Sequence, residues 1–214
     1  MCSEALGAGQ QILVSPLMNI EFLTMPTVDA HYQGLIFTSE NGVMAYAKAQ
    51  GRKDLPAYCV GERTAKAARD VGLQAKSANG SADELVAMVQ ADSHGDLLLH
   101  IRGAHTRGDV AGRFGAQVDE VVAYRQIAMP LNDVAQAALA AGRVMILPVF
   151  SPRTAQIFFK AAGRITAPLR IVAISQVVKE AILGSNPPEN MIIHTAAAPN
   201  AEAMLKEIQR CIAA

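Results

Sequence analysis

Short apolar runs alternate with longer Ala-rich stretches along most of the chain. The short runs are rich in Val, Ile and Leu, and most are continuously apolar, as expected of strands covered on both faces of a parallel sheet. Nine strands are predicted, at 10–17, 34–39, 57–61, 73–78, 96–103, 118–127, 144–149, 170–175 and 191–196. Strands that alternate with helical stretches predict an α/β fold built from βαβ units.

The helical stretches begin at capping residues and end at glycines. Ser81 with Glu84 fits a capping box, and Ser151 followed by Pro152 fits an N-cap with proline at the first helical position. Glycines at 51, 72, 142, 163 and 184 fit helix C-termini. Eight helices are predicted, at 43–50, 62–71, 81–90, 107–114, 131–142, 152–163, 177–183 and 200–210.

Two irregular segments, 19–33 and 124–133, each carry one proline and suggest crossings between lobes. Nine strands are also too many for one small open sheet. We therefore predict an inserted α/β lobe and an outer α/β lobe. The boundaries are 27–121 for the inserted lobe, 1–22 plus 127–214 for the outer lobe, and 19–33 and 122–133 for the connectors.

Composition narrows the functional class. Hydrophobic residues make up 51% of the chain, and 19 basic residues balance 19 acidic ones, which is typical of a globular protein and argues against a nucleic-acid partner. Cys2, Cys59 and Cys211 are widely spaced, which favours a reducing compartment and argues against a zinc site. No signal peptide and no membrane-length apolar run is apparent. We predict a cytoplasmic protein without a membrane partner.

Several predicted strands end in a polar turn that opens the next helix: FTSENG, VGERTA, RGAHTRG, PVFSPRTA and ISQVV. The carboxyl ends of parallel strands and the N-termini of helices bind anions, so these turns predict an anionic-ligand surface. The same Ser and Thr residues would cap helices without any ligand, and that alternative stays open.

Nucleophile-elbow, phosphate-loop and dinucleotide motifs are absent, so cofactor-free chemistry is expected. His100 and His105, with only Asp109 nearby, form a poor metal site, and we interpret the histidines as incidental and Thr106 as a helix cap.

Five segments in register carry a resemblance to a known family: LIFTSENGV, YCVGERTAKAARDVGL, LLLHIRGAHTRGDVAGRF with the following VDEVVAYR, FSPRTAQIFF, and IVAISQVVKEAIL. Together they resemble the uroporphyrinogen-III synthase family. The resemblance implies two flavodoxin-like parallel-sheet lobes joined by a two-stranded connector, with the active site in the cleft between them.

The resemblance also implies a reaction. The substrate would be hydroxymethylbilane, a linear tetrapyrrole with eight carboxylates, cyclised to uroporphyrinogen III with loss of water and inversion of ring D. No cofactor or metal is implied, and hydroxymethylbilane synthase is a transient partner. Tyr124 matches the family's connector tyrosine and would be the general acid. The substrate-binding residues would be Thr38, Ser39, Thr64, Arg102, Gly103, Ser151, Arg153 and Ser175.

Two features depart from the family pattern. The usual first strand ending in Arg-Pro, and most of the helix after it, are missing before MCSEALGAGQ, so we expect a start upstream of Met1, a rearranged outer lobe or a poorly active protein. Val177 and Val178 replace a Gly and Thr pair that many relatives have. The alternative to the enzyme is a truncated or decayed homologue that binds an anion or a protein without catalysis. A sugar-phosphate-binding domain is a third class, but no base or phosphate loop supports it.

Overall fold

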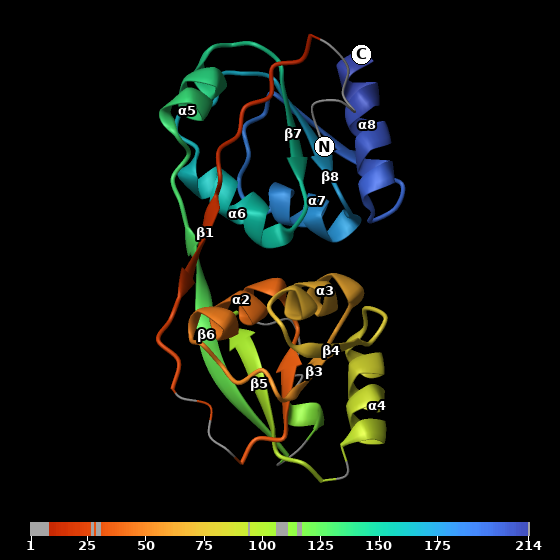
Figure 1. Cartoon of the computed structure of the whole chain (residues 1–214). Helices are drawn as coiled ribbons and strands as arrows, with labels where there is room; N and C mark the ends of the chain where they lie inside the picture. The colour runs from red at the N-terminus through yellow and green to blue at the C-terminus, as the bar shows by residue number, and fades with distance from the viewer. Residues whose placement is uncertain are drawn as a thin grey trace. The chain divides into compact units, whose positions relative to one another are not determined.

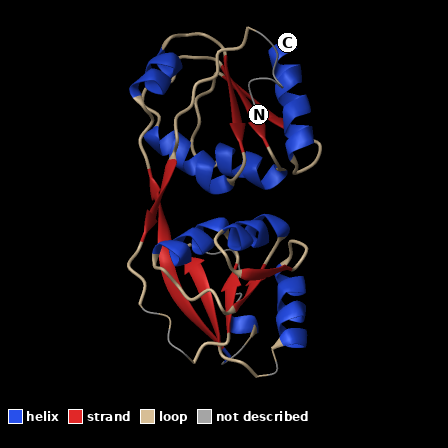
Figure 2. Ribbon diagram, viewed as in Figure 1, coloured by secondary structure: helices blue, strands red, loops and turns tan. Residues whose placement is uncertain are grey.

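The computed structural model describes residues 9–26, 28, 31–93, 95–105, 111–114 and 117–213 (Figure 1). The chain divides into two compact units, Ile20–Ile127 and Met1–Asn19 with Ala128–Ala214. Each unit contains its own β-sheet with helices packed against it (Figure 2). The fold is therefore α/β, as the alternating pattern predicts.

The Ile20–Ile127 unit contains a six-stranded sheet in the order β1-β6-β5-β2-β3-β4. Its strands are β1 (Met18–Phe22), β2 (Gly34–Phe37), β3 (Pro56–Cys59), β4 (Gln74–Ser77), β5 (Leu98–Gly103) and β6 (Val118–Ala128). Its helices are α2 (Glu40–Lys48), α3 (Glu62–Asp70), α4 (Ala82–Asp92) and the short 3-10 helix η1 (Ala111–Arg113). The predicted helix at 107–114 thus appears as one 3-10 turn, and its residues 107–110 lie outside the described part of the chain.

The first strand differs from the prediction. Residues 18–22 form β1, inside a segment predicted to be irregular, and β1 pairs with β6. The Leu23 N–H donates to the Ala123 carbonyl and the Met129 N–H to the Leu17 carbonyl, so the residue numbers run in opposite directions and the pair is antiparallel. An ion pair between Glu21 and Arg125 joins the same two strands. The sheet is therefore mixed rather than wholly parallel.

The strand order also corrects the flavodoxin-like prediction. The five parallel strands, numbered from β2 as the first, run 3-2-1-4-5 across the sheet, whereas the flavodoxin order is 2-1-3-4-5. The first of these parallel strands, β2, lies in the middle. The chain then moves outward through β3 and β4 and returns through α4 to β5, on the other side of β2. The order consequently reverses between β2 and β5, where α/β sheets bind their ligands.

Both faces of this sheet are covered. Leu35, Phe37 and Ile101 pack with residues of α2 and α3 on one face. Ile36 and Leu98, which alternate with them along β2 and β5, pack with Leu85 and Val89 of α4 on the other. Each strand therefore contributes side chains to two cores, which explains the continuous apolar runs in the sequence.

The second unit has a three-stranded parallel sheet in the order β7-β8-β9. Its elements are α5 (Asp133–Ala140), β7 (Met145–Val149), α6 (Pro152–Ala161), β8 (Leu169–Ala173), α7 (Gln176–Leu183), β9 (Met191–Thr195) and α8 (Ala201–Ala213). One core cluster lies around Leu169, Ile171 and Phe158, and another around Val172 and Met204 beneath α8.

The strand predicted at 10–17 is wrong, because these residues form no regular element. Instead of a strand ladder, the side chain of Asn132, the N-cap of α5, donates to the Val14 carbonyl, and the Asn132 N–H donates to Ser15 Oγ. Val14 is 74% exposed, and Pro16 has no N–H to donate. Residues 10–17 are thus held by hydrogen bonds from Asn132 and not by a neighbouring strand.

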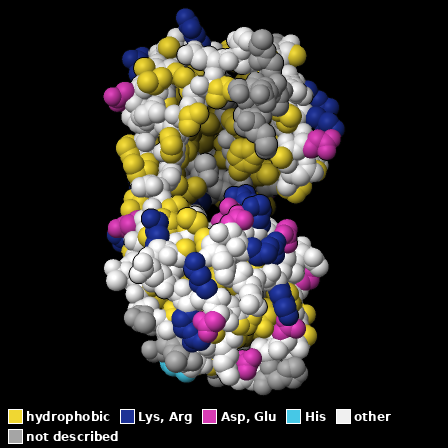
Figure 3. Space-filling model, viewed as in Figure 1, with side chains coloured by type: hydrophobic (Ala, Val, Ile, Leu, Met, Phe, Trp, Pro, Cys, Tyr) yellow, Lys and Arg dark blue, Asp and Glu magenta, His cyan; other side chains and the backbone are white. Residues whose placement is uncertain are grey.

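The surface of the Ile20–Ile127 unit carries basic and acidic side chains next to one another (Figure 3). Pairs such as Lys66 with Asp70 and Arg52 with Asp54 are exposed, so each contributes at most about 1 kcal/mol. This pairing fits the net charge of zero. Among the described residues, no helix has the length and hydropathy needed to span a membrane.

Candidate functional site

The carboxyl ends of β2 and β5 bring four of the predicted site residues to the point where the strand order reverses. Thr38 and Ser39 follow β2 directly, and Arg102 and Gly103 are the last two residues of β5. The two strands are parallel neighbours, with Phe37 beside Ile101. This edge of the sheet is therefore the candidate site in the Ile20–Ile127 unit.

A polar cluster of four residues lies on the α4 face of this edge: Thr38, His100, Arg102 and Glu120. His100 is 1% exposed, and its Nε2 lies 3.3 Å from Thr38 Oγ1. Its Nδ1 lies 3.0 Å from Oε1 of Glu120, the residue opposite it on β6. Arg102 Nε lies 2.8 Å from the other carboxylate oxygen, Oε2. Three neighbouring strands are thus linked by one chain of polar contacts.

Burial fixes the charge state of His100. Removal from water lowers the pKa of the imidazole, and the hydrogen bond and the charge of Glu120 only partly oppose this effect. The neutral ring is therefore the favoured form at neutral pH. A neutral imidazole has one N–H donor and one lone-pair acceptor, so its two contacts must differ in direction.

The guanidinium of Arg102 is already engaged by neighbouring groups and is not fully available to bind a ligand carboxylate. Its Nε contacts Glu120 as an ion pair without hydrogen-bond geometry to any described residue, and its Nη1 donates to the carbonyl of Gly103 at 3.1 Å. The Arg102 side chain is 23% exposed. A ligand carboxylate would consequently have to share this guanidinium with Glu120.

Tyr124 lies on the opposite face of the sheet, in the core formed with α2 and α3. The register between β5 and β6 shifts after Arg102, so that Gly103 lies beside Tyr124 and Ala123 is passed over. This irregularity turns the tyrosine toward Gly103. A Cβ placed on Gly103 would lie 2.7 Å from Tyr124 Cζ, which explains why a glycine occupies this position. The Tyr124 hydroxyl makes no hydrogen bond within the described residues.

Ser39 and Thr64 have structural tasks in this unit. Ser39 is the N-cap of α2, and its side chain accepts a hydrogen bond from the Asn41 N–H at 3.2 Å. Thr64 is the third residue of α3 and is 6% exposed, which leaves little of its surface for a ligand. The predicted cap Thr106 and the nearby Asp109 lie outside the described residues.

Three predicted residues lie in the second unit, at the starts of α6 and α7. Ser151 is the N-cap of α6, with its Oγ accepting from the Thr154 N–H at 3.1 Å, and Arg153 is the second residue of that helix. Ser175 is the N-cap of α7 but makes no side-chain capping bond. Val149 and Ala173 are register partners, so both helix starts lie at the same edge of the sheet. Nearby Val177 is 63% exposed, whereas Val178 is buried.

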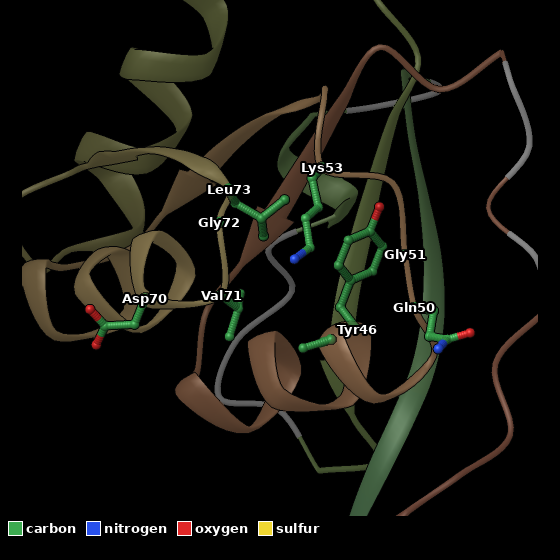
Figure 4. Close-up of a pocket in the computed structure, with 9 residues that line it drawn as sticks. Tyr46, Gln50, Gly51, Lys53, Asp70, Val71, Gly72 and Leu73 are labelled. Carbon is green, nitrogen blue, oxygen red and sulfur yellow. The ribbon is translucent and has the colours of Figure 1, made fainter.

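A hollow in the described surface lies elsewhere in the Ile20–Ile127 unit. It measures about 360 Å³ and is formed at the C-terminal ends of α2 and α3, around Tyr46, Lys53 and Gly72 (Figure 4). The Tyr46 hydroxyl donates to the Arg52 carbonyl, and the ring leaves no room for a side chain at Gly51. None of the predicted site residues lines this hollow, because it adjoins the opposite ends of the strands.

Among the described residues, one group could offer ligands to a metal: His194, Glu207 and Cys211, whose ligand atoms lie within 4.8 Å of one another. Glu207 already pairs with His194 at 3.1 Å and with Arg210 at 3.1 Å. Burial also raises the pKa of the Cys211 thiol, which opposes the thiolate that a metal requires. The group is therefore explained as an ion-pair cluster.

Comparison with known proteins identifies the family. The family model of uroporphyrinogen-III synthase HemD matches residues 3–206. The chain belongs to the uroporphyrinogen-III synthase family. A crystal structure of uroporphyrinogen-III synthetase from Helicobacter pylori has a similar fold, with a TM-score of 0.70, 18% sequence identity and 91% of each chain covered. No curated protein sequence matches the chain.

Membership of the uroporphyrinogen-III synthase family places the chain in tetrapyrrole biosynthesis and confirms the resemblance seen in its sequence. It also gives a context for the polar cluster, which the sequence reasoning missed because it treated His100 as incidental. A signal was available in the sequence. A histidine within the apolar run LLLHI must be buried, and a buried histidine requires partners from neighbouring strands.

Proposed function

We propose that the chain cyclises hydroxymethylbilane to uroporphyrinogen III, with loss of water and inversion of ring D, and that it needs no cofactor. Family membership supports the reaction class. The observation that carries the proposal for this chain is the position of Tyr124, beside Gly103 at the carboxyl end of β5. Its hydroxyl makes no hydrogen bond to any described residue, and the side chain is 7% exposed, so the proposal requires the substrate to reach the hydroxyl itself rather than the ring.

In the proposed reaction, Tyr124 acts as the general acid. Its phenol donates a proton to the terminal hydroxyl of the bilane, the carbon–oxygen bond breaks, and water leaves. The substituted α-carbon of ring D attacks the remaining cation and gives a spiro intermediate. The bond from that carbon to the methylene bridge of ring C then breaks, and the bridge bonds to the other α-carbon of ring D, which inverts the ring. The newly bonded α-carbon of ring D loses its proton as that pyrrole ring regains aromaticity, and this proton returns to the phenolate, so the tyrosine is regenerated. General acid catalysis of this kind contributes about 10²- to 10⁴-fold in rate.

The remaining task is to hold the flexible substrate in one conformation, because the free bilane closes spontaneously without inversion. Hydroxyls and N–H groups at helix starts hold carboxylates at about 0.3–1 kcal/mol per exposed contact. We propose Ser39, Ser151, Arg153 and Ser175 for this role. Arg102 and Gly103 complete it at the end of β5, and Thr64 remains a predicted contact limited by its burial.

Two further parts of the proposal concern surroundings. We propose a transient contact with hydroxymethylbilane synthase, since its product is unstable. We also propose the cytoplasm as the compartment, because Cys59 and Cys211 are free thiols.

A product analysis tests the proposal. Purified protein is supplied with freshly made hydroxymethylbilane, and isomers I and III are separated after oxidation to the porphyrins. We expect isomer III to dominate, and Tyr124→Phe to lower kcat by about 10²-fold or more with a smaller change in KM. Tyr58→Phe is the matched control, because Tyr58 is also a buried tyrosine of the same unit but lies in β3. If folded protein yields no isomer III above the spontaneous background, the proposed function fails.

A further inference from the structure

The contacts of His100 fix the direction of every hydrogen bond in the polar cluster. Glu120 forms an ion pair with Arg102, in which Oε2 lies 2.8 Å from the Arg102 Nε. An ionised carboxylate can only accept hydrogen bonds, so His100 Nδ1, 3.0 Å from Oε1, must carry the proton.

The other ring nitrogen is then an acceptor. His100 is 1% exposed, and the burial that lowers the pKa of its imidazole favours the neutral ring. With the proton on Nδ1, the Nε2 lone pair faces Thr38 Oγ1 at 3.3 Å. Thr38 must therefore donate its only hydroxyl proton to His100.

We propose that His100 is a positioning residue. Its Nε2 accepts the hydroxyl proton of Thr38, so that Thr38 presents only acceptor lone pairs to a ligand at the carboxyl end of β2. A carboxylate has no proton to offer such an oxygen and would be repelled by it. The ligand group that fits is an N–H donor, which in the proposed substrate is a pyrrole nitrogen. The identity of this ligand rests on the proposed function; the direction of the hydrogen bonds does not.

The proposal changes the role predicted for Thr38 from a carboxylate clamp to an acceptor for a ring nitrogen. It also explains why a buried His–Glu–Arg array lies at the reversal point of the sheet. Removal of Glu120 would free the ring to adopt its other tautomer, in which Nε2–H donates to Thr38 and the hydroxyl can donate to a carboxylate. Glu120 and Arg102 therefore act through His100 to set what Thr38 recognises.

Nitrogen NMR of the histidine rings tests the hydrogen-bond directions without any substrate. In ¹⁵N-labelled protein at pH 7.5, with His100→Asn used to assign the signals, we expect the His100 ring to be neutral with the proton on Nδ1. Thr38→Val should move the Nε2 shift toward that of an unbonded lone pair, whereas Thr38→Ser should leave it near the wild-type value. A proton on Nε2, or a charged ring, would overturn the proposal.

The same signal tests what Thr38 binds. Uroporphyrinogen III, kept reduced, is added until the backbone amide shifts of the Ile20–Ile127 unit no longer change. If Thr38 accepts from a pyrrole N–H, the His100 Nε2 shift stays at its hydrogen-bonded value. If Thr38 instead donates to a carboxylate, Nε2 loses its partner and moves to the Thr38→Val value, which overturns the inference.

Kinetics supply a second readout. Thr38→Val and His100→Asn should each lower kcat/KM by about fivefold to tenfold, the usual effect of one hydrogen bond. The double variant should be no worse than the poorer single variant, because both remove the same contact. Multiplying losses would mean that the residues act independently and would contradict the inference. A wild-type protein that makes no isomer III would refute the proposed function. The NMR test of the His100 hydrogen-bond directions uses no substrate, so its result would be unaffected.

Discussion

Gly103 packs directly against the ring of Tyr124 at the candidate site. A Cβ at position 103 would lie 2.7 and 2.8 Å from two atoms of the tyrosine ring and 3.0 Å from its hydroxyl oxygen. Tyr124 is 7% exposed, so the ring has little space into which to move. We expect Gly103→Ala to displace the Tyr124 hydroxyl and to lower the free energy of unfolding by about 1–3 kcal/mol. Turnover should fall further than this loss of stability explains, as measured at a temperature where the variant is folded.

Gly163→Ala is the control for this substitution. The nearest atom to a Cβ at position 163 is 3.8 Å away, so no neighbour has to shift. If Gly103→Ala retains wild-type turnover and stability, then the Tyr124 ring is not held against Gly103, and the geometric argument for its role as an acid loses its support.

At the scale of elements, the N-caps of α6 and α7 differ in a way that separates capping from binding. Ser151 satisfies the Thr154 N–H, whereas Ser175 makes no side-chain capping bond. Ser151→Ala should therefore lower the free energy of unfolding by about 1 kcal/mol, and Ser175→Ala should change it by only a few tenths. Since Ser175 has no capping bond to lose, any rise in KM on its removal measures ligand contact.

Ser81→Ala is the reference for a cap without a proposed ligand role. Ser81 and Glu84 form a complete capping box at the start of α4, so this variant should lose stability and keep wild-type KM. A Ser175→Ala variant with unchanged KM and kcat would remove Ser175 from the proposed binding residues.

Local chemistry made most elements predictable. The capping box at Ser81 and the Ser151–Pro152 start of α6 appear as expected, because a cap is made by residues within one turn of each other. Gly72 and Gly142 adopt the left-handed backbone conformation that helix ends require. Eight of the nine predicted strands coincide with strands of the described residues.

The predictions fail where contacts between residues far apart in the sequence determine the secondary structure. Residues 10–17 have an apolar pattern suited to a strand, but Asn132 binds their backbone and no strand pairs with them. Residues 18–22 lack a clear strand pattern and become β1 because β6 extends beyond β5 and offers it a partner. Both outcomes depend on contacts more than 100 residues apart in the sequence.

The candidate site was likewise predictable from local sequence but not in the contacts that depend on strand register. The rule that ligands bind at strand ends located Thr38 and Arg102, since it needs only the position of each strand. The partners of these residues could not be predicted, because the contact between His100 and Glu120 depends on the register of β5 against β6. The separation of Tyr124 from the polar cluster by the sheet likewise follows from the register shift after Arg102.

For the Ile20–Ile127 unit as a whole, His100 links stability to pH. The ring lies between β2, β5 and β6, and the charged groups that face it are Glu120 and Arg102. Its pKa in the folded unit is below the ordinary value of 6.5. As the pH falls below about 6.5, the unfolded chain gains a proton that the folded unit does not bind, so the free energy of unfolding decreases. The decrease ends below the folded-state pKa, where both states are protonated.

Hydrogen exchange of the β2 and β5 amides measures this effect, because amides in the central strands of a sheet exchange through unfolding of the whole unit. Between pH 7.5 and pH 5, the wild type should lose more protection than His100→Asn, which has no ring to protonate. His105→Gln removes an exposed histidine five residues away and should behave as the wild type does. Equal losses in the wild type and His100→Asn would show that His100 is protonated as readily in the folded unit as in the unfolded chain. The neutral ring that commits the Thr38 proton would then have no basis.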